Sequence, residues 1–161
     1  MNQKKITQYV KVATSMDSDD WGTPLDLFNK LNKKYNFTLD AAANDKNYKC
    51  KKYYTKENSG LTKDWTNERV FCNPPYSDLG LWIKKCYVES KNAKLIVMLI
   101  PCRTDTKNFH KYIWNIAEII YIKGRLKFTN DNGKSKGSAP FPSMIVIYTK
   151  YIKITNQIKL F

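Results

Sequence analysis

The sequence predicts an α/β fold in which helices cover both faces of a mostly parallel β-sheet. Apolar runs of strand length alternate along the chain with amphipathic segments of helical length, and this alternation is typical of parallel strands joined by crossover helices. The run "LIVMLI" at 95–100 is wholly apolar, as expected of a strand that is buried on both faces. The length of 161 residues suits one compact domain.

The first helix is predicted over 23–35, "TPLDLFNKLNKKY". Thr23 is a favourable N-cap, and Pro24 is a favourable first helical residue. Apolar side chains recur at helical spacing and would form the buried face of this helix. These residues are Leu27, Phe28, Leu31 and Tyr35.

Six strands and two further helices complete the pattern. The strands are predicted over 36–39, 51–55, 69–72, 93–100, 118–122 and 144–152, and the helices over 79–90 and 104–116. Polar segments follow three of the strands, namely "DAAAN" (40–44), "NPPY" (73–76) and "PCRTDT" (101–106). Because ligands bind outside the carboxyl ends of parallel strands, we expect these three segments to build one site.

The charge of the chain favours a polyanionic partner. Lys and Arg number 28 against 14 Asp and Glu, which gives a net charge of +14. A field of this sign attracts nucleic acids, although lysines that are merely solvated would give the same count. The charge does not separate DNA from RNA as the partner.

The four cysteines are irregularly spaced and His110 is the single histidine, so no metal site is predicted. The N-terminus lacks an apolar signal core, and the run at 95–100 is too short to span a bilayer. We therefore expect a soluble, cytoplasmic protein without a membrane partner, either a monomer or a weak homodimer. Its polar residues 1–20 would form a flexible arm, and residues 21–161 a single domain.

Residues 73–76, "NPPY", stop a predicted strand abruptly. Pro74 and Pro75 lack N–H groups and hold the backbone extended, which leaves carbonyl oxygens as acceptors. Asn73 adds a side-chain oxygen, and Tyr76 adds a ring that can stack on a planar ligand. Two acceptors suit an amino group with two hydrogens, and they would stabilise the positive charge that develops on an attacking nitrogen. The motif predicts an amino group activated for attack on an electrophile; a Pro-Pro turn with a capping Asn is the alternative.

This tetrapeptide resembles the catalytic motif of amino-methyltransferases that use S-adenosylmethionine. Most of the chain from 21 to 148 also resembles the phage-type, Dam-like family of DNA N-6-adenine methyltransferases. The matching segments are "WGTP" (21–24), "LDAAAND" (39–45), "GLTKDW" (60–65), "FCNPPY" (71–76), "VMLIPCRTDTKNFH" (97–110) and the C-terminal "GRLKF" and "APFPSMIVIY". The resemblance implies a Rossmann-like methyltransferase fold without a separate target recognition domain, and a phage or mobile-element origin. It leaves open genome protection or restriction–modification as the biological role.

The resemblance also implies how S-adenosylmethionine is held. Thr23 and Pro24 would lie at the methionine end of the donor. Asp40 would accept a hydrogen bond from its ammonium group, and Asp64, beside Trp65, one from its adenine amine. The full set of implied donor-binding residues is Trp21, Thr23, Pro24, Asp40, Ala41, Ala42, Asn44, Asp64, Trp65 and Asn73.

Plain structural roles are alternatives for several of these residues. Thr23 is a good N-cap, Asp40 could cap a turn, and Trp65 could belong to the core. The glycine-rich loop of other donor-binding folds is replaced here by alanines and Asn44. No acidic residue stands out for the ribose of the donor, and Glu57 is a candidate.

The segment 124–143 is rich in glycine, proline and basic residues, so it is either an inert flexible tip or a functional loop. As a functional loop it would hold DNA phosphates and press on an adenine flipped out of the duplex. The residues expected to do so are Arg125, Lys127, Phe128, Lys134 and Lys136. Arg103 is a further candidate for a phosphate contact, with a salt bridge to Asp105 as the alternative.

Three functions follow from these observations. The first is methyl transfer to the 6-amino group of adenine in DNA. The second is methylation of another acceptor, either an amino group of an RNA base or a glutamine amide of a protein. The third is a non-catalytic DNA-binding protein on a methyltransferase scaffold, which the intact "NPPY" quartet disfavours.

Overall fold

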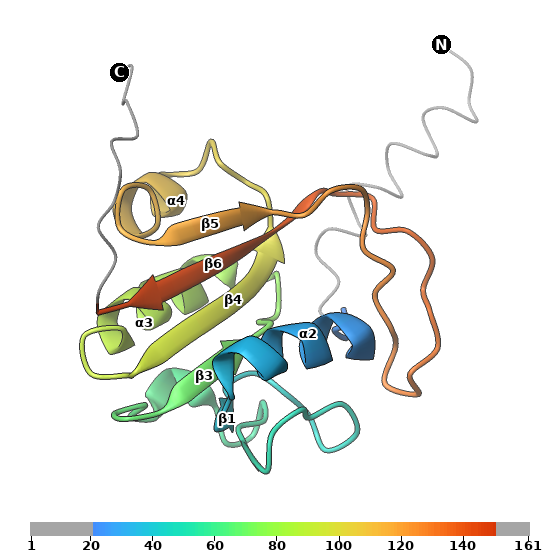
Figure 1. The fold of residues 1–161 in the computed structure, drawn as a ribbon, viewed down its shortest axis with the longest axis horizontal. Coiled ribbons are helices and arrows are strands. Elements are labelled where there is room, and N and C mark those ends of the chain that lie inside the picture. Colours follow the sequence, from blue (N-terminus) through green and yellow to red (C-terminus); the bar gives the residue numbers. More distant parts are fainter. Residues whose placement is uncertain (1–20, 151–161) are drawn as a thin grey trace.

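The computed structural model of the protein describes residues 21–150. A single sheet of six strands has the order β2-β1-β3-β4-β6-β5 (Figure 1). The strands are β1 (Leu39–Asp40), β2 (Lys52–Tyr53), β3 (Arg69–Cys72), β4 (Leu95–Pro101), β5 (Glu118–Tyr121) and β6 (Ser143–Thr149). The first four strands run parallel to one another, whereas β6 is antiparallel to both of its neighbours. The predicted α/β fold with a mostly parallel sheet is confirmed.

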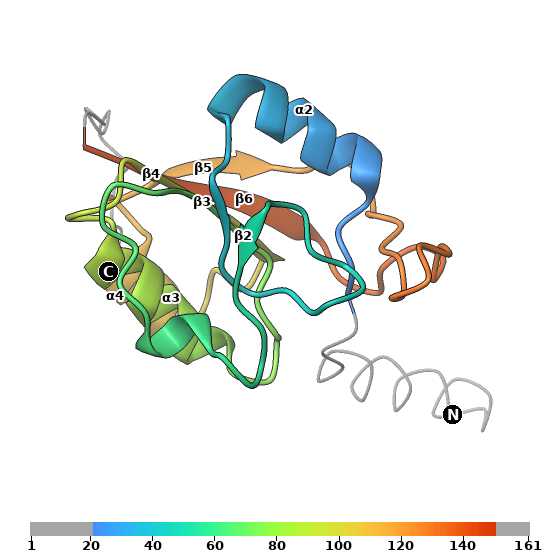
Figure 2. The same ribbon diagram turned by 90° about the horizontal axis from the view of Figure 1, so that it is seen from below.

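Helices cover both faces of this sheet, as Figure 2 shows. The helix α2 (Leu25–Tyr35) packs on one face, and α3 (Leu79–Glu89) and α4 (Lys107–Tyr112) pack on the other. A short 3-10 helix, η1 (Gly60–Thr62), precedes β3. Among residues 21–150, no helix combines the length and the apolar character that crossing a membrane requires.

Strand β4 contributes to both halves of the core. Its residues Leu95, Val97 and Leu99 pack toward α2, and the residues between them pack toward α3 and α4. Every residue of β4 is buried, which explains why its sequence is a continuous apolar run rather than an alternating one. Burying each such side chain stabilises the fold by roughly 1.5–3 kcal/mol.

The start of α2 corrects one prediction. The helix begins at Leu25, and Pro24 is the residue at its cap position, where no side-chain hydrogen bond is made. Thr23 is therefore not the N-cap. Its hydroxyl instead accepts a hydrogen bond from the Asn73 side chain at 3.0 Å, so a tertiary contact replaces the expected local one.

The other elements occur in the predicted order, but several bounds differ: β1 is Leu39–Asp40 instead of 36–39, and β2 is Lys52–Tyr53 instead of 51–55. Helix α4 is shorter than the expected 104–116 at both ends: Thr106 caps its start by accepting a hydrogen bond from the Phe109 N–H, and Ile113 is the residue at its C-terminal cap. Strand β6 ends at Thr149. The last residues predicted for this strand, 151–152, and the predicted arm 1–20 lie outside the described residues.

Candidate active site

A cavity of about 520 Å³ lies at the carboxyl ends of β1, β2 and β3. Segments from four parts of the chain form its wall. Of the residues expected to bind a methyl donor, the structure brings six to this cavity. They are Trp21, Thr23, Asp40, Ala42, Asn44 and Asn73.

The other four residues expected to hold the donor lie away from this wall. Pro24, Ala41, Asp64 and Trp65 do not line the cavity. Nor does the segment after β4, because Arg103 lines a separate, smaller cavity of about 120 Å³ between α3 and α4. The large cavity is therefore built from two of the three polar segments expected to meet, and the third forms its neighbour.

Asp40, at the end of β1, places a buried carboxyl group in the cavity wall. The residue is 3% exposed, and burial raises the pKa of this carboxyl to about 6. The backbone N–H groups of Lys49 (3.0 Å) and Ala42 (3.5 Å) donate to its two oxygens and partly oppose this rise. Desolvation disfavours the charged form of this carboxyl group, whereas a nearby positive charge favours it. A cation bound in the cavity would therefore stabilise the carboxylate and be stabilised by it.

Asn73 follows β3, and its side-chain amide has one defined orientation. The Nδ2 group donates to the carbonyl oxygen of Trp21 and to the hydroxyl of Thr23. Since a carbonyl can only accept, the NH₂ group must face Trp21, and the side-chain oxygen must face the other way. That oxygen accepts a hydrogen bond from the Tyr76 hydroxyl at 3.3 Å. The N-terminal "WGTP" segment thus fixes the acceptor oxygen of the "NPPY" loop.

Tyr76 belongs to a buried cluster of four aromatic rings rather than to the cavity wall. It is 2% exposed, and burial raises the pKa of its hydroxyl. The ring of Trp21 stacks near it at 6.5 Å between centroids and an interplanar angle of 17°. Phe141 and Phe128 present edge-on contacts at 5.5 and 6.4 Å. A planar ligand can stack on Tyr76 only if one of these rings moves.

Phe128 corrects another expectation. It was predicted to press on a base from an exposed loop, yet its side chain is 0% exposed because it packs against Trp21, Tyr76 and Phe141. The apolar ring is excluded from water, while the basic residues around it remain exposed. These are Arg125, Lys127, Lys134 and Lys136.

The middle of the segment 124–143 forms a β-hairpin, which we call the basic hairpin (residues 128–136). Its two arms are joined by hydrogen bonds from the Lys136 N–H to the Phe128 carbonyl and from the Asn130 N–H to the Lys134 carbonyl. Gly133, with φ of +73°, allows the tight turn between them. In Figure 2 the hairpin lies beside the loop that follows β1.

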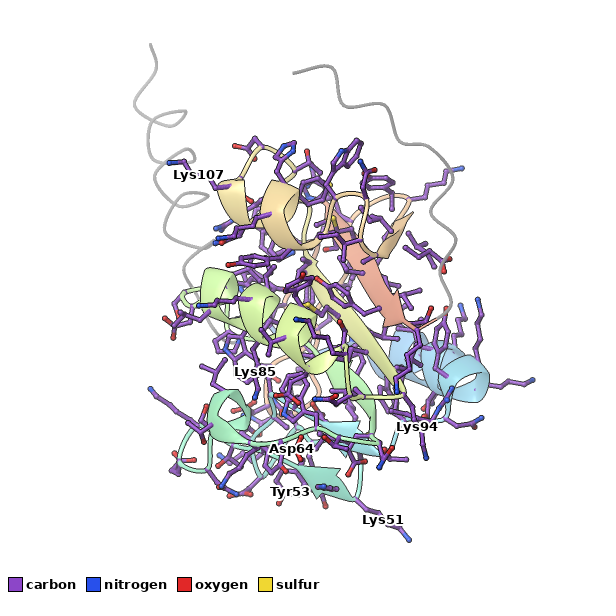
Figure 3. The ribbon with its side chains drawn as sticks, turned by 90° about the vertical axis from the view of Figure 1, so that its left-hand side faces the viewer. Lys51, Tyr53, Asp64, Lys85, Lys94 and Lys107 are labelled. Atoms are coloured by element: carbon purple, nitrogen blue, oxygen red, sulfur yellow. The ribbon has the colours of Figure 1, made fainter. Side chains whose placement is uncertain are left out.

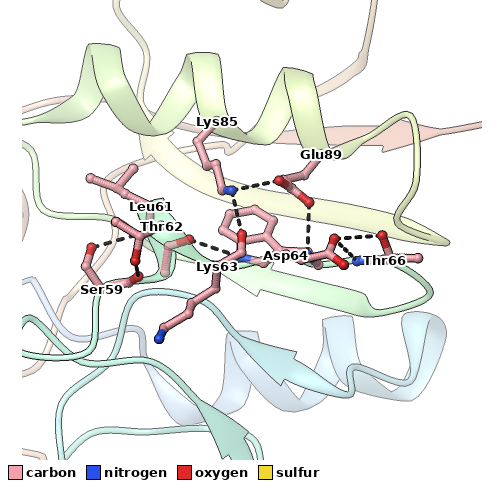
Figure 4. Close-up of polar contacts among 10 residues, drawn as sticks. Ser59, Leu61, Thr62, Lys63, Asp64, Thr66, Lys85 and Glu89 are labelled. Atoms are coloured by element: carbon pink, nitrogen blue, oxygen red, sulfur yellow. Dashed lines mark hydrogen bonds and ion pairs between the residues drawn. The ribbon is translucent and has the colours of Figure 1, made fainter.

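The "GLTKDW" motif folds as a structural unit against α3 (Figure 4). The Asp64 carboxylate accepts hydrogen bonds from the N–H and hydroxyl of Thr66, and Figure 3 places it on the outer flank below Lys85. Trp65 is fully buried, and its backbone N–H donates to Glu89 at 2.9 Å. Glu89 in turn pairs with Lys85 at 2.7 Å. We therefore leave Asp64 and Trp65 out of the proposed donor site.

Sequence reasoning missed several residues of the cavity wall. Glu57, which follows β2, was a candidate and does line the cavity. Asn47, Lys49 and Asp78 lie in the segments that follow β1 and β3, so the position after a strand end was the available signal for them. Trp82 reaches the cavity from the helix α3, for which strand ends give no signal.

An α/β sheet with this strand order, an "NPPY" loop after β3 and a cavity lined by a buried carboxyl group define a methyltransferase fold. The sequence pattern of the family described as DNA N-6-adenine-methyltransferase (Dam) matches residues 11–160. The chain belongs to this family.

Two phage proteins, each named DNA N-6-adenine-methyltransferase, are similar over most of the chain. The protein of Escherichia phage T1 is 32% identical over an alignment of length 166 that covers 86% of this chain and 70% of that protein. The protein of Haemophilus phage HP1 is 33% identical over 137 residues, which cover 82% of this chain and 79% of that protein.

Proposed function

We propose that this protein transfers a methyl group from S-adenosylmethionine to the exocyclic 6-amino group of adenine in DNA. The observation that carries the proposal is the fixed acceptor oxygen of Asn73 at the edge of a ligand-sized cavity, in a chain of the DNA N-6-adenine-methyltransferase family. A net charge of +14 suits a DNA substrate.

The cavity fits S-adenosylmethionine in size and in polar groups. Its volume of about 520 Å³ falls in the usual range for small-molecule sites, about 300–1,000 Å³. Asp40 suits the ammonium group. The indole N–H of Trp21 is buried and has no hydrogen-bond partner among residues 21–150, so it is a ready donor for a carboxylate. Glu57 suits the ribose hydroxyls. When bound, S-adenosylmethionine supplies a methyl group on a positively charged sulfur.

Asn73 and the Pro74 carbonyl act on the target amine. The lone pair of an adenine amine is conjugated with the ring, which makes the nitrogen a poor nucleophile. Hydrogen bonds from its two hydrogens to the Asn73 side chain and the Pro74 carbonyl favour a pyramidal nitrogen. These bonds strengthen as positive charge develops, so they stabilise mainly the transition state. Pro75, which lines the cavity, keeps the loop extended.

Tyr76 provides the stacking surface for an adenine flipped out of the duplex. The amine of the base replaces the Tyr76 hydroxyl on the Asn73 oxygen, and the base displaces a neighbouring ring of the aromatic cluster. The exposed cations of the basic hairpin, together with Arg125 and Lys127, bind DNA phosphates on either side of the flipped nucleotide. Arg103, near Tyr76 in the neighbouring cavity, is a further phosphate contact.

The identity of the acceptor can be tested directly. The protein is incubated with labelled S-adenosylmethionine and, in turn, duplex DNA, RNA or a protein mixture, and the methylated product is identified by mass spectrometry. We expect N6-methyladenine in DNA. The variant Asn73→Ala loses the activity, while Asn29→Ala, on the exposed face of α2, keeps it. Label in RNA or protein alone would assign a different acceptor, and no label despite donor binding would point to a non-catalytic protein.

A further inference from the structure

The basic hairpin joins two parts of the donor cavity rim that are distant in the sequence. At its base, Thr129 and Gly22 exchange two backbone hydrogen bonds of 2.8 Å. The approach is so close that a Cβ on Gly22 would lie 2.7 Å from the Thr129 carbonyl oxygen. At its tip, one carboxylate oxygen of Asp131 accepts from the side chains of Asn44 (2.9 Å) and Asn47 (3.2 Å). Gly22, Asn44 and Asn47 line the cavity, whereas the hairpin braces it from outside.

Asp131 determines how both asparagine side chains are oriented. A carboxylate only accepts hydrogen bonds, so each NH₂ group must face it. The Asn44 side-chain oxygen then accepts from the N–H groups of Lys46 and Asn47 at 2.8 and 2.9 Å. The Asn47 oxygen accepts from the Asn44 N–H at 2.9 Å. Removing the Asp131 carboxylate would leave the NH₂ groups of Asn44 and Asn47 without their acceptor at the tip of the hairpin. The part of the cavity wall that these two asparagines form would then be less ordered.

The hairpin also carries groups suited to DNA. Lys134 and Lys136 are exposed on its second arm, and the Lys136 ammonium lies 4.7 Å from the ring centre of Trp21, which lines the cavity. One short element thus holds the donor side through Asp131 and offers cations to a phosphate backbone. DNA that holds the lysines in place would also hold Asp131 and Thr129 in place, and with them the two parts of the rim.

We propose that Asp131 is a positioning residue for the methyl donor, and that the basic hairpin makes donor binding and DNA binding mutually favourable. This inference rests on the proposed function. When the hairpin already holds the cavity rim in place, binding of the donor carries no further entropic cost of ordering the cavity wall. Because coupling between two ligands is reciprocal, the donor tightens DNA binding by the same factor.

The test measures binding of S-adenosylhomocysteine, which has no methyl group to transfer, by calorimetry with and without saturating duplex DNA. In the wild-type protein we expect DNA to lower the Kd by at least about fivefold. In Asp131→Ala, the Kd without DNA rises about tenfold and the effect of DNA falls below about twofold. Its kcat at saturating S-adenosylmethionine stays within about twofold, which a general loss of structure would not allow.

Two further variants act as controls. Asp131→Asn retains an acceptor oxygen and restores both the Kd and the effect of DNA to within about threefold of the wild type. Asn132→Ala, in the same turn, behaves as the wild type. An unchanged effect of DNA in Asp131→Ala would overturn the inference. So would an equal loss in Asp131→Asn, which would assign the effect to charge, or an equal loss in Asn132→Ala.

The outcomes also separate this inference from the proposed function. If the wild-type protein transfers no methyl group to DNA, the proposed function fails. If it methylates DNA while the two ligands bind independently, only the role of the hairpin fails.

Discussion

Replacing Asp40 by Asn should stabilise the fold at pH 8, but not at pH 4, and should weaken donor binding. Burial raises the pKa of this carboxyl from 3.8 to about 6. At 1.36 kcal/mol per pKa unit, this pKa difference contributes about 3 kcal/mol to the free energy of unfolding. The folded state binds the proton more tightly than the unfolded state, so this stability is present at low pH. It is lost as the pH rises through the range from about 4 to about 6.

Asn has no such titration, so the variant and the wild type diverge as the pH rises. One amide oxygen must serve the two N–H donors, those of Lys49 and Ala42, which costs the variant about 1 kcal/mol at every pH. The net prediction for the donor-free protein is a variant that is about 1 kcal/mol less stable at pH 4 and about 2 kcal/mol more stable at pH 8.

Urea unfolding of both proteins at constant ionic strength between pH 4 and pH 8 measures this difference. Calorimetry at pH 8 should show donor affinity reduced about 10- to 100-fold in Asp40→Asn, since hydrogen bonds to charged groups contribute about 1.5–3 kcal/mol. In the wild type, donor affinity should fall as the pH drops below about 6. A stability difference between the two proteins that does not change with pH would refute the raised pKa of the buried Asp40 carboxyl group. An unchanged donor affinity in Asp40→Asn would refute its contact with the donor.

Three other variants test separate parts of the account. Glu89→Ala leaves Lys85 without its ion-pair partner and should lower the free energy of unfolding by about 3 kcal/mol; a loss below about 1 kcal/mol in urea unfolding would contradict the structural role of this pair. Tyr76→Phe keeps the ring and should retain kcat/KM within about tenfold, whereas Tyr76→Ala should lose about 10- to 100-fold; equal losses in steady-state assays would show that the hydroxyl matters more than stacking. Removing the ammonium groups of Lys134 and Lys136 together should reduce the slope of log K against log salt by about 1.8 in DNA titrations, and an unchanged slope would place the DNA elsewhere.

The sequence was sufficient where local pattern and tertiary environment agree. A continuous apolar run such as 95–100 has few stable alternatives to a central strand, and β4 is that strand. The strand ends also predicted where polar residues would gather, and Asp40 and Asn73 do meet at one cavity. These features depend on periodicity and on the general geometry of parallel sheets.

The errors arose where a distant partner overrides a local preference. Thr23 has the propensity of an N-cap, but Asn73, 50 positions away in the sequence, takes its hydroxyl. Phe128 lies in a segment rich in glycine and lysine, and nothing local indicates that three other rings close around it. Asp64 is a different case, because its donor role was implied by the motif alone and its carboxylate accepts from Thr66, two residues later in the sequence.

The most direct test of the account is the rate of a single turnover on DNA with protein and S-adenosylmethionine in excess. This measurement isolates the methyl-transfer step, in which we propose that the Asn73 oxygen acts. Asn73→Ala should slow methylation by about 100- to 1,000-fold, the usual loss when one stabilising group is removed from a developing charge, while DNA affinity stays near that of the wild type. A rate within about threefold of the wild type would show that the fixed acceptor oxygen does not activate the amine.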